Sequence, residues 1–332
     1  MLQIKRKRNY GIDIARILSM FMVVVLHNLL QGGVLDFDSL GTANLMYFYL
    51  ENLCIIAVNL FALISGYLMV DRKWKWQKLI VLWCTVIFWS VVTTGSFMVF
   101  RGTFNVKLLI KSFFPVLLKQ YWYFNGYIVL FLLIPFLNAG FKYLEEKVIS
   151  SVILALVLLS VTVGFIGNLF EQGGYTAFWL IVMYLVGAWI KKRQPIIKPI
   201  WLLMIYFGGA MVSLLGEVLS IVKIGHVDSW IKYNSPIVVV QAIAILLFLS
   251  NLKVTNNKVC QWLTSVSAMT FTVYLIDGNH YFYQYVLTNS FSFIKGVNLF
   301  SGVITILIGS IVMFMIFISV EYIRTSIMKK IR

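Results

Sequence analysis

The stretch GIDIARILSMFMVVVLHNLL, residues 11–30, is long enough to cross the hydrocarbon core of a bilayer as a helix, yet it contains three ionisable side chains. Arg16 and His27 share one helix face, because eleven residues at about 100° each complete about three turns, or about 16 Å along the axis. Asp13 lies on the same face, one turn before Arg16. Ionisable side chains in a spanning helix usually face a bundle interior or a water-filled cavity. The stretch therefore predicts a membrane helix that carries a polar site, with Asp13, Arg16 and His27 as candidate catalytic residues.

The composition of the whole chain indicates an integral membrane protein. Of its 332 residues, 61% are hydrophobic and 12% are charged, whereas soluble domains have about 45–50% and about 25%. Apolar stretches long enough to cross about 30 Å of hydrocarbon recur along the whole length. We therefore expect a single all-α, polytopic membrane domain over residues 1–332 with about ten transmembrane helices. The predicted spans are 10–31, 43–70, 78–100, 121–141, 148–168, 174–190, 199–221, 235–251, 264–287 and 297–321.

The positions of the basic residues predict the orientation of these helices. Lys and Arg are enriched in the cytoplasmic loops of membrane proteins. With both termini cytoplasmic, twenty of the 28 Lys and Arg residues fall on the inner side and seven on the outer side. Four of those seven lie in 101–119, whose pattern is typical of an amphipathic helix in the membrane interface. Because the net charge of +16 is spread over short loops, it does not indicate a nucleic-acid partner.

The cysteine and histidine positions predict no metal site. Cys54, Cys84 and Cys260 are far apart in the sequence and lie in or beside apolar segments. Buried thiols of this kind usually act as small apolar residues. The three histidines have no zinc-like spacing, so we expect no bound metal.

The segment DRKWKWQK, residues 71–78, has more positive charge than topology requires. It places four cations beside two tryptophans, on the side predicted to be cytoplasmic. One interpretation is an anchor to anionic lipid headgroups with an aromatic belt. The other is a clamp for an anionic cytoplasmic ligand, such as the phosphates of a nucleotide-like cofactor. Its cations are Arg72, Lys73, Lys75 and Lys78.

Six segments, in order along the chain, carry a resemblance to a known family. The most specific is the first, in which Gly11-Ile12-Asp13 precedes Arg16, and ten residues separate Arg16 from His27. The others are FALISGYLM (61–69), YWYFNGYIVLFLLIPFLN (121–138), GYTAFWLIVMYLVGAWIKK (174–192), YNSPIVVVQAI (233–243) and TFTVYLIDGNH (270–280). Together they resemble the acyltransferase 3 family of integral membrane acyltransferases, in particular the O-acetyltransferases of bacterial surface polysaccharides.

The resemblance implies a substrate pair and a location. It implies transfer of an acetyl or other short acyl group from acyl-CoA to a sugar hydroxyl of a polysaccharide or of its lipid-linked precursor. The protein would then lie in the bacterial cytoplasmic membrane, with the lipid bilayer and the sugar acceptor as its partners. Arg16 and the cations of 71–78 would hold the CoA phosphates, which arginine binds well.

The chemistry of acyl transfer assigns roles within the first span. A sugar hydroxyl is a poor nucleophile at neutral pH and needs a base to take its proton. His27 is the histidine firmly within a span, and imidazole titrates in the right range. Asp13 would orient Arg16 and offset its charge. Taken singly, an arginine can extend its side chain to the membrane surface, and a histidine can serve as an interhelical hydrogen-bonding group.

Five further residues are candidates for substrate binding. Trp122 and Tyr123 form either an aromatic belt or a platform on which a sugar stacks. Glu51 and Asp277 are carboxyl groups within predicted spans, where they need a partner or a proton. Relatives often have histidine at the position of Asp277, and His280 follows three residues later. Many also have histidine at the position of Gln120, and either difference puts the inferred chemistry of that position in doubt.

A passive conduit is the alternative from another functional class. A polar track across the membrane would also suit an exporter or flippase for polysaccharide or lipid-linked sugar, in which no bond is made. Such proteins often contain internal repeats with paired broken helices. We find no convincing repeat in this sequence, which favours the enzyme.

Overall fold

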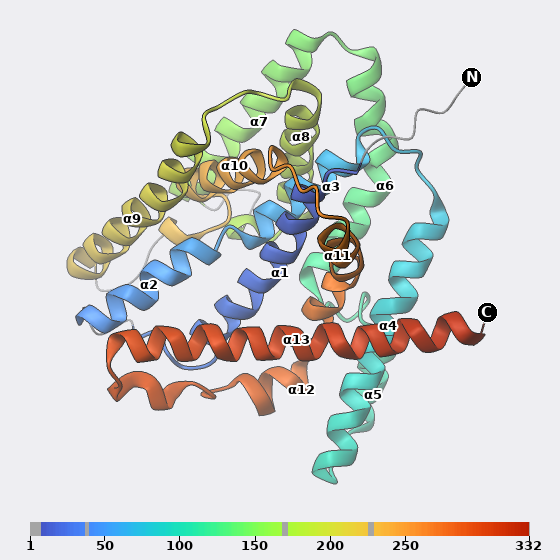
Figure 1. Cartoon of the computed structure of the whole chain (residues 1–332), viewed down its shortest axis with the longest axis vertical. Coiled ribbons are helices and arrows are strands. Elements are labelled where there is room, and N and C mark those ends of the chain that lie inside the picture. Colours follow the sequence, from blue (N-terminus) through green and yellow to red (C-terminus); the bar gives the residue numbers. More distant parts are fainter. Residues whose placement is uncertain (1–7, 37–39, 168–171, 225–228, 332) are drawn as a thin grey trace.

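The computed structural model describes residues 8–36, 40–167, 172–224 and 229–331, and within these ranges it contains helices and no strands. Figure 1 shows the helices packed into one bundle with α1 inside it. The helices are α1 (Tyr10–Leu30), α2 (Thr42–Cys54), α3 (Ala57–Met69), α4 (Trp76–Arg101), α5 (Val106–Phe113), α6 (Trp122–Tyr143), α7 (Glu146–Gly167), α8 (Ala177–Arg193), α9 (Pro199–Ile224), α10 (Pro236–Ser250), α11 (Asn257–Asp277), α12 (His280–Phe282) and α13 (Leu299–Ile331).

The helix count confirms an all-α, polytopic membrane fold. Within the described ranges, eight helical segments are long and apolar enough to cross a membrane, with α2 and α3 together forming one of them. The apolar α10 is shorter, and α8 has 17 residues. These ten segments correspond in order to the ten predicted spans, and α5 is a short additional helix within 101–119.

Three predicted spans differ from the observed helices, and the last of them, 297–321, ends ten residues before the end of α13 at Ile331. The span 43–70 is interrupted at Ile55 and Ile56, between α2 and α3. The predicted boundaries of 264–287 are wrong, because α11 begins after Asn256, whose side chain accepts hydrogen bonds from the first helical amides, and ends at Asp277. After Gly278 the chain turns into α12 and a π-helical turn over Tyr283–Leu287. The stretch Asp277-Gly278-Asn279-His280 at this break is polar, and an Asp-Gly pair is a common turn signal, so the predicted span continued past a helix end that the sequence marks.

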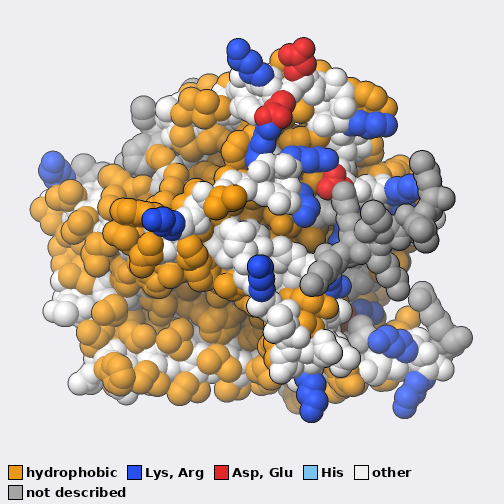
Figure 2. Space-filling model, turned by 45° about the horizontal axis from the view of Figure 1, so that its top comes forward, with side chains coloured by type: hydrophobic (Ala, Val, Ile, Leu, Met, Phe, Trp, Pro, Cys, Tyr) orange, Lys and Arg blue, Asp and Glu red, His pale blue; other side chains and the backbone are white. Residues whose placement is uncertain are grey.

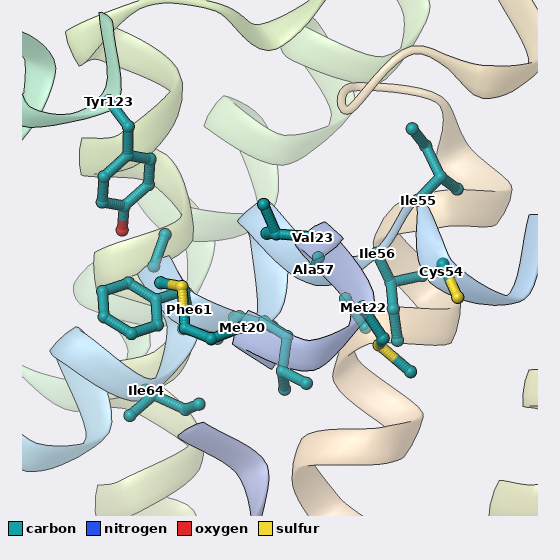
Figure 3. Packing of buried hydrophobic residues seen from close by; sticks show 14 of the residues in the cluster. Met20, Met22, Val23, Cys54, Ile55, Ile56, Ala57, Phe61, Ile64 and Tyr123 are labelled. Atoms are coloured by element: carbon teal, nitrogen blue, oxygen red, sulfur yellow. The ribbon is translucent and has the colours of Figure 1, made fainter. Parts of the chain in front are cut away.

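The first helix is central because it packs against several others. It contacts α2, α3, α10, α11 and α13. Figure 3 shows Met20, Met22 and Val23 of α1 against Ala57 and Phe61 of α3. Burying both the apolar and the polar side of α1 places its ionisable residues inside the protein.

A close approach of two backbones fixes α3 against α8. A Cβ atom at Gly66 would collide with the carbonyl oxygen of Tyr184, and one at Gly187 with that of Leu63. Only glycine allows two helices to approach this closely. The contact holds the side chains of α3 in place next to α1.

Several basic segments meet at one end of the bundle, which we call the basic end. Lys192 pairs with Asp71 at 2.6 Å, and Arg193 pairs with Glu146. Arg8, Lys191 and Lys253 line one opening there. Figure 2 shows Lys and Arg mainly at the top and right of its view, and a broad hydrophobic area elsewhere on that face. Segments that the charge distribution assigns to one membrane side therefore lie together, although Lys5, Arg6, Lys7 and Arg332 lie outside the described residues.

Candidate active site

His27 is bonded to a carboxylate from a distant part of the chain. Its Nδ1 lies 2.6 Å from Oδ2 of Asp277, the last residue of α11. The Asp277 side chain is fully buried, whereas the His27 side chain keeps 24% of its surface exposed. A carboxylate at Nδ1 fixes the orientation of an imidazole and leaves Nε2 as the nitrogen available for proton transfer. Asp277 is therefore a hydrogen-bonding partner of His27. Because its side chain is buried, it does not contact a substrate in the cavity directly.

The exposed part of His27 faces a cavity of about 340 Å³, which we call the aromatic cavity. The Trp122 ring lies 4.7 Å from that of Tyr175 and is stacked at 6.0 Å on that of Tyr233. Aromatic faces bind the C–H faces of sugars while polar groups at the rim fix the orientation. The polar and aromatic lining consists of His27, Gln31, Phe61, Gln120, Tyr121, Trp122, Tyr123, Tyr175, Tyr233, Tyr274 and Tyr283.

A second cavity of about 300 Å³ contains the arginine of the first span, and we call it the arginine cavity. Its cations are Arg16, Arg72 and Lys78, which come from α1, the loop after α3 and the start of α4. Phe61 and Tyr123 line both cavities, and their ring centroids are 5.7 Å apart. Figure 3 shows these two side chains next to each other beside α1. The polar face of α1 thus connects two cavities that meet at an aromatic pair.

The predicted cation clamp is divided by the structure. Arg72 and Lys78 line the arginine cavity, and Arg72 also lines a second opening, where Lys73 lies with Lys142 and Lys192. Lys75 is exposed and precedes the first residue of α4. The indole of Trp74 donates a 2.9 Å hydrogen bond to the carbonyl oxygen of Phe131, which anchors the loop to α6.

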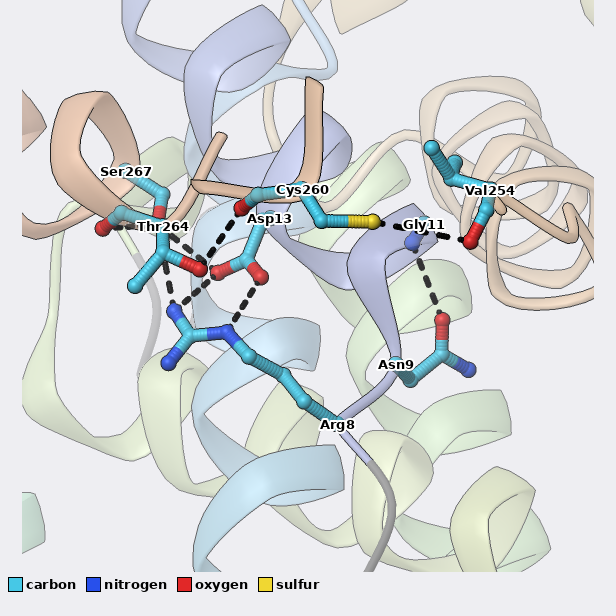
Figure 4. A network of polar contacts seen from close by, with 8 residues as sticks. All are labelled: Arg8, Asn9, Gly11, Asp13, Val254, Cys260, Thr264 and Ser267. Carbon is cyan, nitrogen blue, oxygen red and sulfur yellow. Dashed lines mark hydrogen bonds and ion pairs between the residues drawn. The ribbon is translucent and has the colours of Figure 1, made fainter. Parts of the chain in front are cut away.

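Asp13 has a different partner from the one its spacing predicts. Figure 4 shows its carboxylate between Arg8 and Ser267. Arg8 donates from Nε at 2.6 Å and from Nη2 at 2.7 Å, and the Ser267 hydroxyl donates at 2.7 Å. The hydrogen bond to Asp13 raises the pKa of Arg8 above its usual value. Asp13 is therefore bonded to Arg8 and Ser267 and not to Arg16, because Arg8 precedes the helix and can fold back onto the carboxylate, although the charge of Asp13 still acts on that of Arg16.

This network connects the start of α1 to α11, and we expect its removal to lower the stability of the protein. We expect Asp13→Ala to lower the free energy of unfolding by about 1–3 kcal/mol, because hydrogen bonds to a buried charged group are lost. The control is Asp71→Ala, which removes a more exposed pair with Lys192 and should cost less than about 1 kcal/mol. Thermal melting of the purified variants in detergent measures both. Equal losses would contradict a stabilising role specific to Asp13.

Two candidate substrate ligands lie away from the aromatic cavity. Glu51 is fully buried in α2, and neither of its carboxylate oxygens has a hydrogen-bond partner among the described residues. The charges of Glu51 and Glu217 of α9 act on each other, and Asn52 donates to Glu217 at 3.1 Å, so Glu51 lies on the side of α2 that faces α9. His280 lines a third cavity beside the aromatic one. Glu51 is thus not among the residues that line the cavity of His27.

Several residues of the aromatic cavity were not singled out from the sequence. Tyr175, Tyr233, Tyr274 and Tyr283 come from four separate segments, and three of them lie in or beside the quoted motifs. Tyrosine in an apolar sequence is a weak signal, because most buried tyrosines serve packing. Gln120 lines both the aromatic and the third cavity, and its amide oxygen accepts a 2.8 Å hydrogen bond from Ser90.

Comparison with known proteins gives the family. The model of the acyltransferase 3 family, described as an acyltransferase domain, matches residues 9–320. No curated protein and no solved structure matches the chain. The match covers nearly the whole bundle, including both cavities. The chain therefore belongs to the acyltransferase 3 family and is a multi-pass membrane acyltransferase.

Proposed function

We propose that the protein transfers an acetyl group from acetyl-CoA to a sugar hydroxyl of a cell-envelope or extracellular polysaccharide, or of its lipid-linked precursor. The observation that supports this most is the position of His27, bonded to Asp277 and facing an aromatic cavity that adjoins a cavity lined by cations. The aromatic lining suits a sugar, and the cations suit the phosphates of CoA.

In this proposal His27 is the general base. Its Nε2 takes the proton of the acceptor hydroxyl as the oxygen attacks the thioester carbonyl, and Asp277 at Nδ1 stabilises the resulting imidazolium. Collapse of the tetrahedral intermediate breaks the carbon–sulfur bond. The imidazolium then returns its proton to the departing thiolate, so that the products are the ester and the free thiol.

The donor would enter from the basic end. Because Lys and Arg are enriched in cytoplasmic loops, we infer that this end faces the cytoplasm, where acyl-CoA is found, and that the protein lies in a bacterial cell membrane. Arg16, Arg72 and Lys78 would bind its phosphates. The thioester would reach His27 past Phe61 and Tyr123, about 16 Å further along α1. The acceptor would approach the aromatic cavity from the opposite side.

Donor binding gives a test with a matched control. We expect Arg16→Ala and Arg72→Ala each to weaken binding of radiolabelled acetyl-CoA by about tenfold or more, because each loses a charge-assisted contact. Lys75→Ala removes the same charge from the same loop at a position that does not line the arginine cavity, and it should leave the affinity unchanged. Equal weakening by all three variants would contradict this site.

The enzyme and the conduit differ in whether CoA thiol is released. If the protein is an acyltransferase, the purified wild type with acetyl-CoA should release CoA thiol only when crude envelope glycan is present, whereas a conduit should release none. Absence of both acetyl-CoA binding and thiol release would overturn the proposal and leave export or flipping as the leading account. Loss of acetylation with intact polymer export in His27→Ala would support the enzyme.

A further inference from the structure

A third cavity of about 270 Å³ adjoins the aromatic cavity, and we call it the basic pocket. Gln120, Gly278 and Tyr283 line both cavities, so an acceptor can occupy the two at once. The basic pocket contains three groups that bind anions, Lys111, Lys119 and His280. Its complete lining is Thr94, Leu108, Lys111, Lys119, Gln120, Gly278, His280, Tyr281 and Tyr283.

The charge in this pocket is not neutralised by the protein. No ion pair within the described ranges includes Lys111, Lys119 or His280. Asp277, the carboxylate nearest to His280 in sequence, is bonded to His27. In contrast, Arg101 at the end of α4 lies 4.2 Å from the centre of the Tyr285 ring and is held by that contact. The basic pocket therefore has a surplus of donors directed at a ligand site.

Topology does not account for these cations. Lys111 and Lys119 belong to the segment that the charge distribution assigns to the outer side, where Lys and Arg are depleted in membrane proteins. Two lysines and a histidine around one pocket on that side are contrary to the trend that places the other basic loops. A binding role explains the exception.

The backbone around the two lysines is fixed by specific contacts. Asn105 caps α5 by accepting from the amide of Leu108, which sets the position of Lys111. Asn125 donates to the carbonyl oxygen of Val116 at 3.1 Å, and this carbonyl also accepts from the amide of Lys119. Lys119 itself has a φ of 52°, a left-handed conformation uncommon for residues other than glycine. Such strain is found at functional sites more often than elsewhere.

We propose that the basic pocket binds an anionic group of the acceptor, a carboxylate or a phosphate, while the reacting sugar occupies the aromatic cavity. The inference rests on the proposed function and adds that the acceptor is an acidic saccharide or a sugar phosphate. Lys111 and Lys119 contribute charge-assisted contacts, and His280 contributes a further donor when protonated. The pocket thus selects the acceptor without taking part in the chemical step.

The experiment follows radiolabel from acetyl-CoA into envelope glycan and lipid-linked precursors with the full chain in neutral detergent. The labelled material is cleaved to oligosaccharides and separated by anion exchange into acidic and neutral pools. We expect the label in the acidic pool. Carboxyl reduction and phosphatase treatment, as separate arms, show whether a carboxylate or a phosphate holds the label there.

Variants of the basic pocket test whether this pocket causes the labelling of the acidic pool. The double variant Lys111→Ala/Lys119→Ala should lower labelling of the acidic pool by roughly tenfold or more. Lys111→Arg/Lys119→Arg should retain it. Lys107→Ala removes a lysine of the same helix that does not line the pocket and should behave as wild type. Unchanged melting temperature and acetyl-CoA affinity show that the alanine variant is folded.

The other outcomes overturn the inference in distinguishable ways. Label in the neutral pool, with the double variant equal to wild type, would refute the anionic acceptor and leave the proposed function intact. An effect of the double variant that appears only when anionic lipid is added would assign the pocket to lipid headgroups. Absence of label and of thiol release in wild type would refute the proposed function, and the inference with it.

Discussion

We expect His27→Ala to lower the rate of acyl transfer by about 10²- to 10⁴-fold, which is the usual contribution of a general base. The physical reason is that the acceptor hydroxyl then has no group at the aromatic cavity to take its proton. His27 is the described histidine that lines this cavity, because His280 lines the neighbouring one. The rate of CoA release in the presence of glycan measures the effect.

Donor binding provides the control for this variant. Arg16, Arg72 and Lys78 lie in the other cavity, so the affinity for acetyl-CoA should stay close to that of wild type. A variant that loses binding and turnover together would indicate misfolding, and its melting temperature would show this. A folded variant that binds acetyl-CoA and transfers at the wild-type rate would remove His27 from the mechanism.

The second large effect is expected at the positioning residue Asp277. Asp277→Asn keeps the shape of the side chain but removes the negative charge 2.6 Å from Nδ1 of His27. In serine protease triads the equivalent change permits the wrong tautomer and costs about 10⁴-fold in kcat. We therefore expect a loss of about 10²- to 10⁴-fold in kcat, with the KM for acetyl-CoA little changed.

If Asp277 served only to hold α1 against α11, the expected result of its substitution would differ. In that case Asp277→Asn would lower the melting temperature while the rate per folded molecule stayed at the wild-type value. Asp277→Glu separates the two further, since it restores a carboxylate. Partial recovery of kcat in Asp277→Glu, without a matching change in stability, would support the positioning role.

The sequence predicts the helices well because each span depends on local hydropathy. It also places Arg16 and His27 on one face, since a single helix fixes their relation. The error at 264–287 arose because the predicted span was drawn through the polar stretch Asp277-Gly278-Asn279-His280, although the helix ends at Asp277. A helix end of this kind is marked by turn-forming residues such as Asp-Gly, to which hydropathy averaged over a long window gives little weight.

The partners of the site residues were beyond prediction for a related reason. Asp277 meets His27 across 250 residues of sequence, and no periodicity relates the two. Asp13 bonds to Arg8 and Ser267 because the chain before α1 folds back, whereas helical spacing indicates only Arg16. Glu51 is a carboxyl group within a span, as is typical of a site residue, but it lies on the side of α2 that faces α9. Spacing within one helix was informative, and contacts between helices required the structure.

The position of Phe61 and Tyr123 between the two cavities has a consequence for the cell in which this protein acts. Phe61 and Tyr123 line both cavities and therefore lie between the cavity of Arg16 and the cavity of His27. In the proposed orientation, the nucleotide part of the donor stays with the cytoplasm and the glycan stays outside. Only a two-carbon fragment then needs to change sides. A cell that modifies its exterior in this way keeps its coenzyme pool, because only the acyl group leaves the donor.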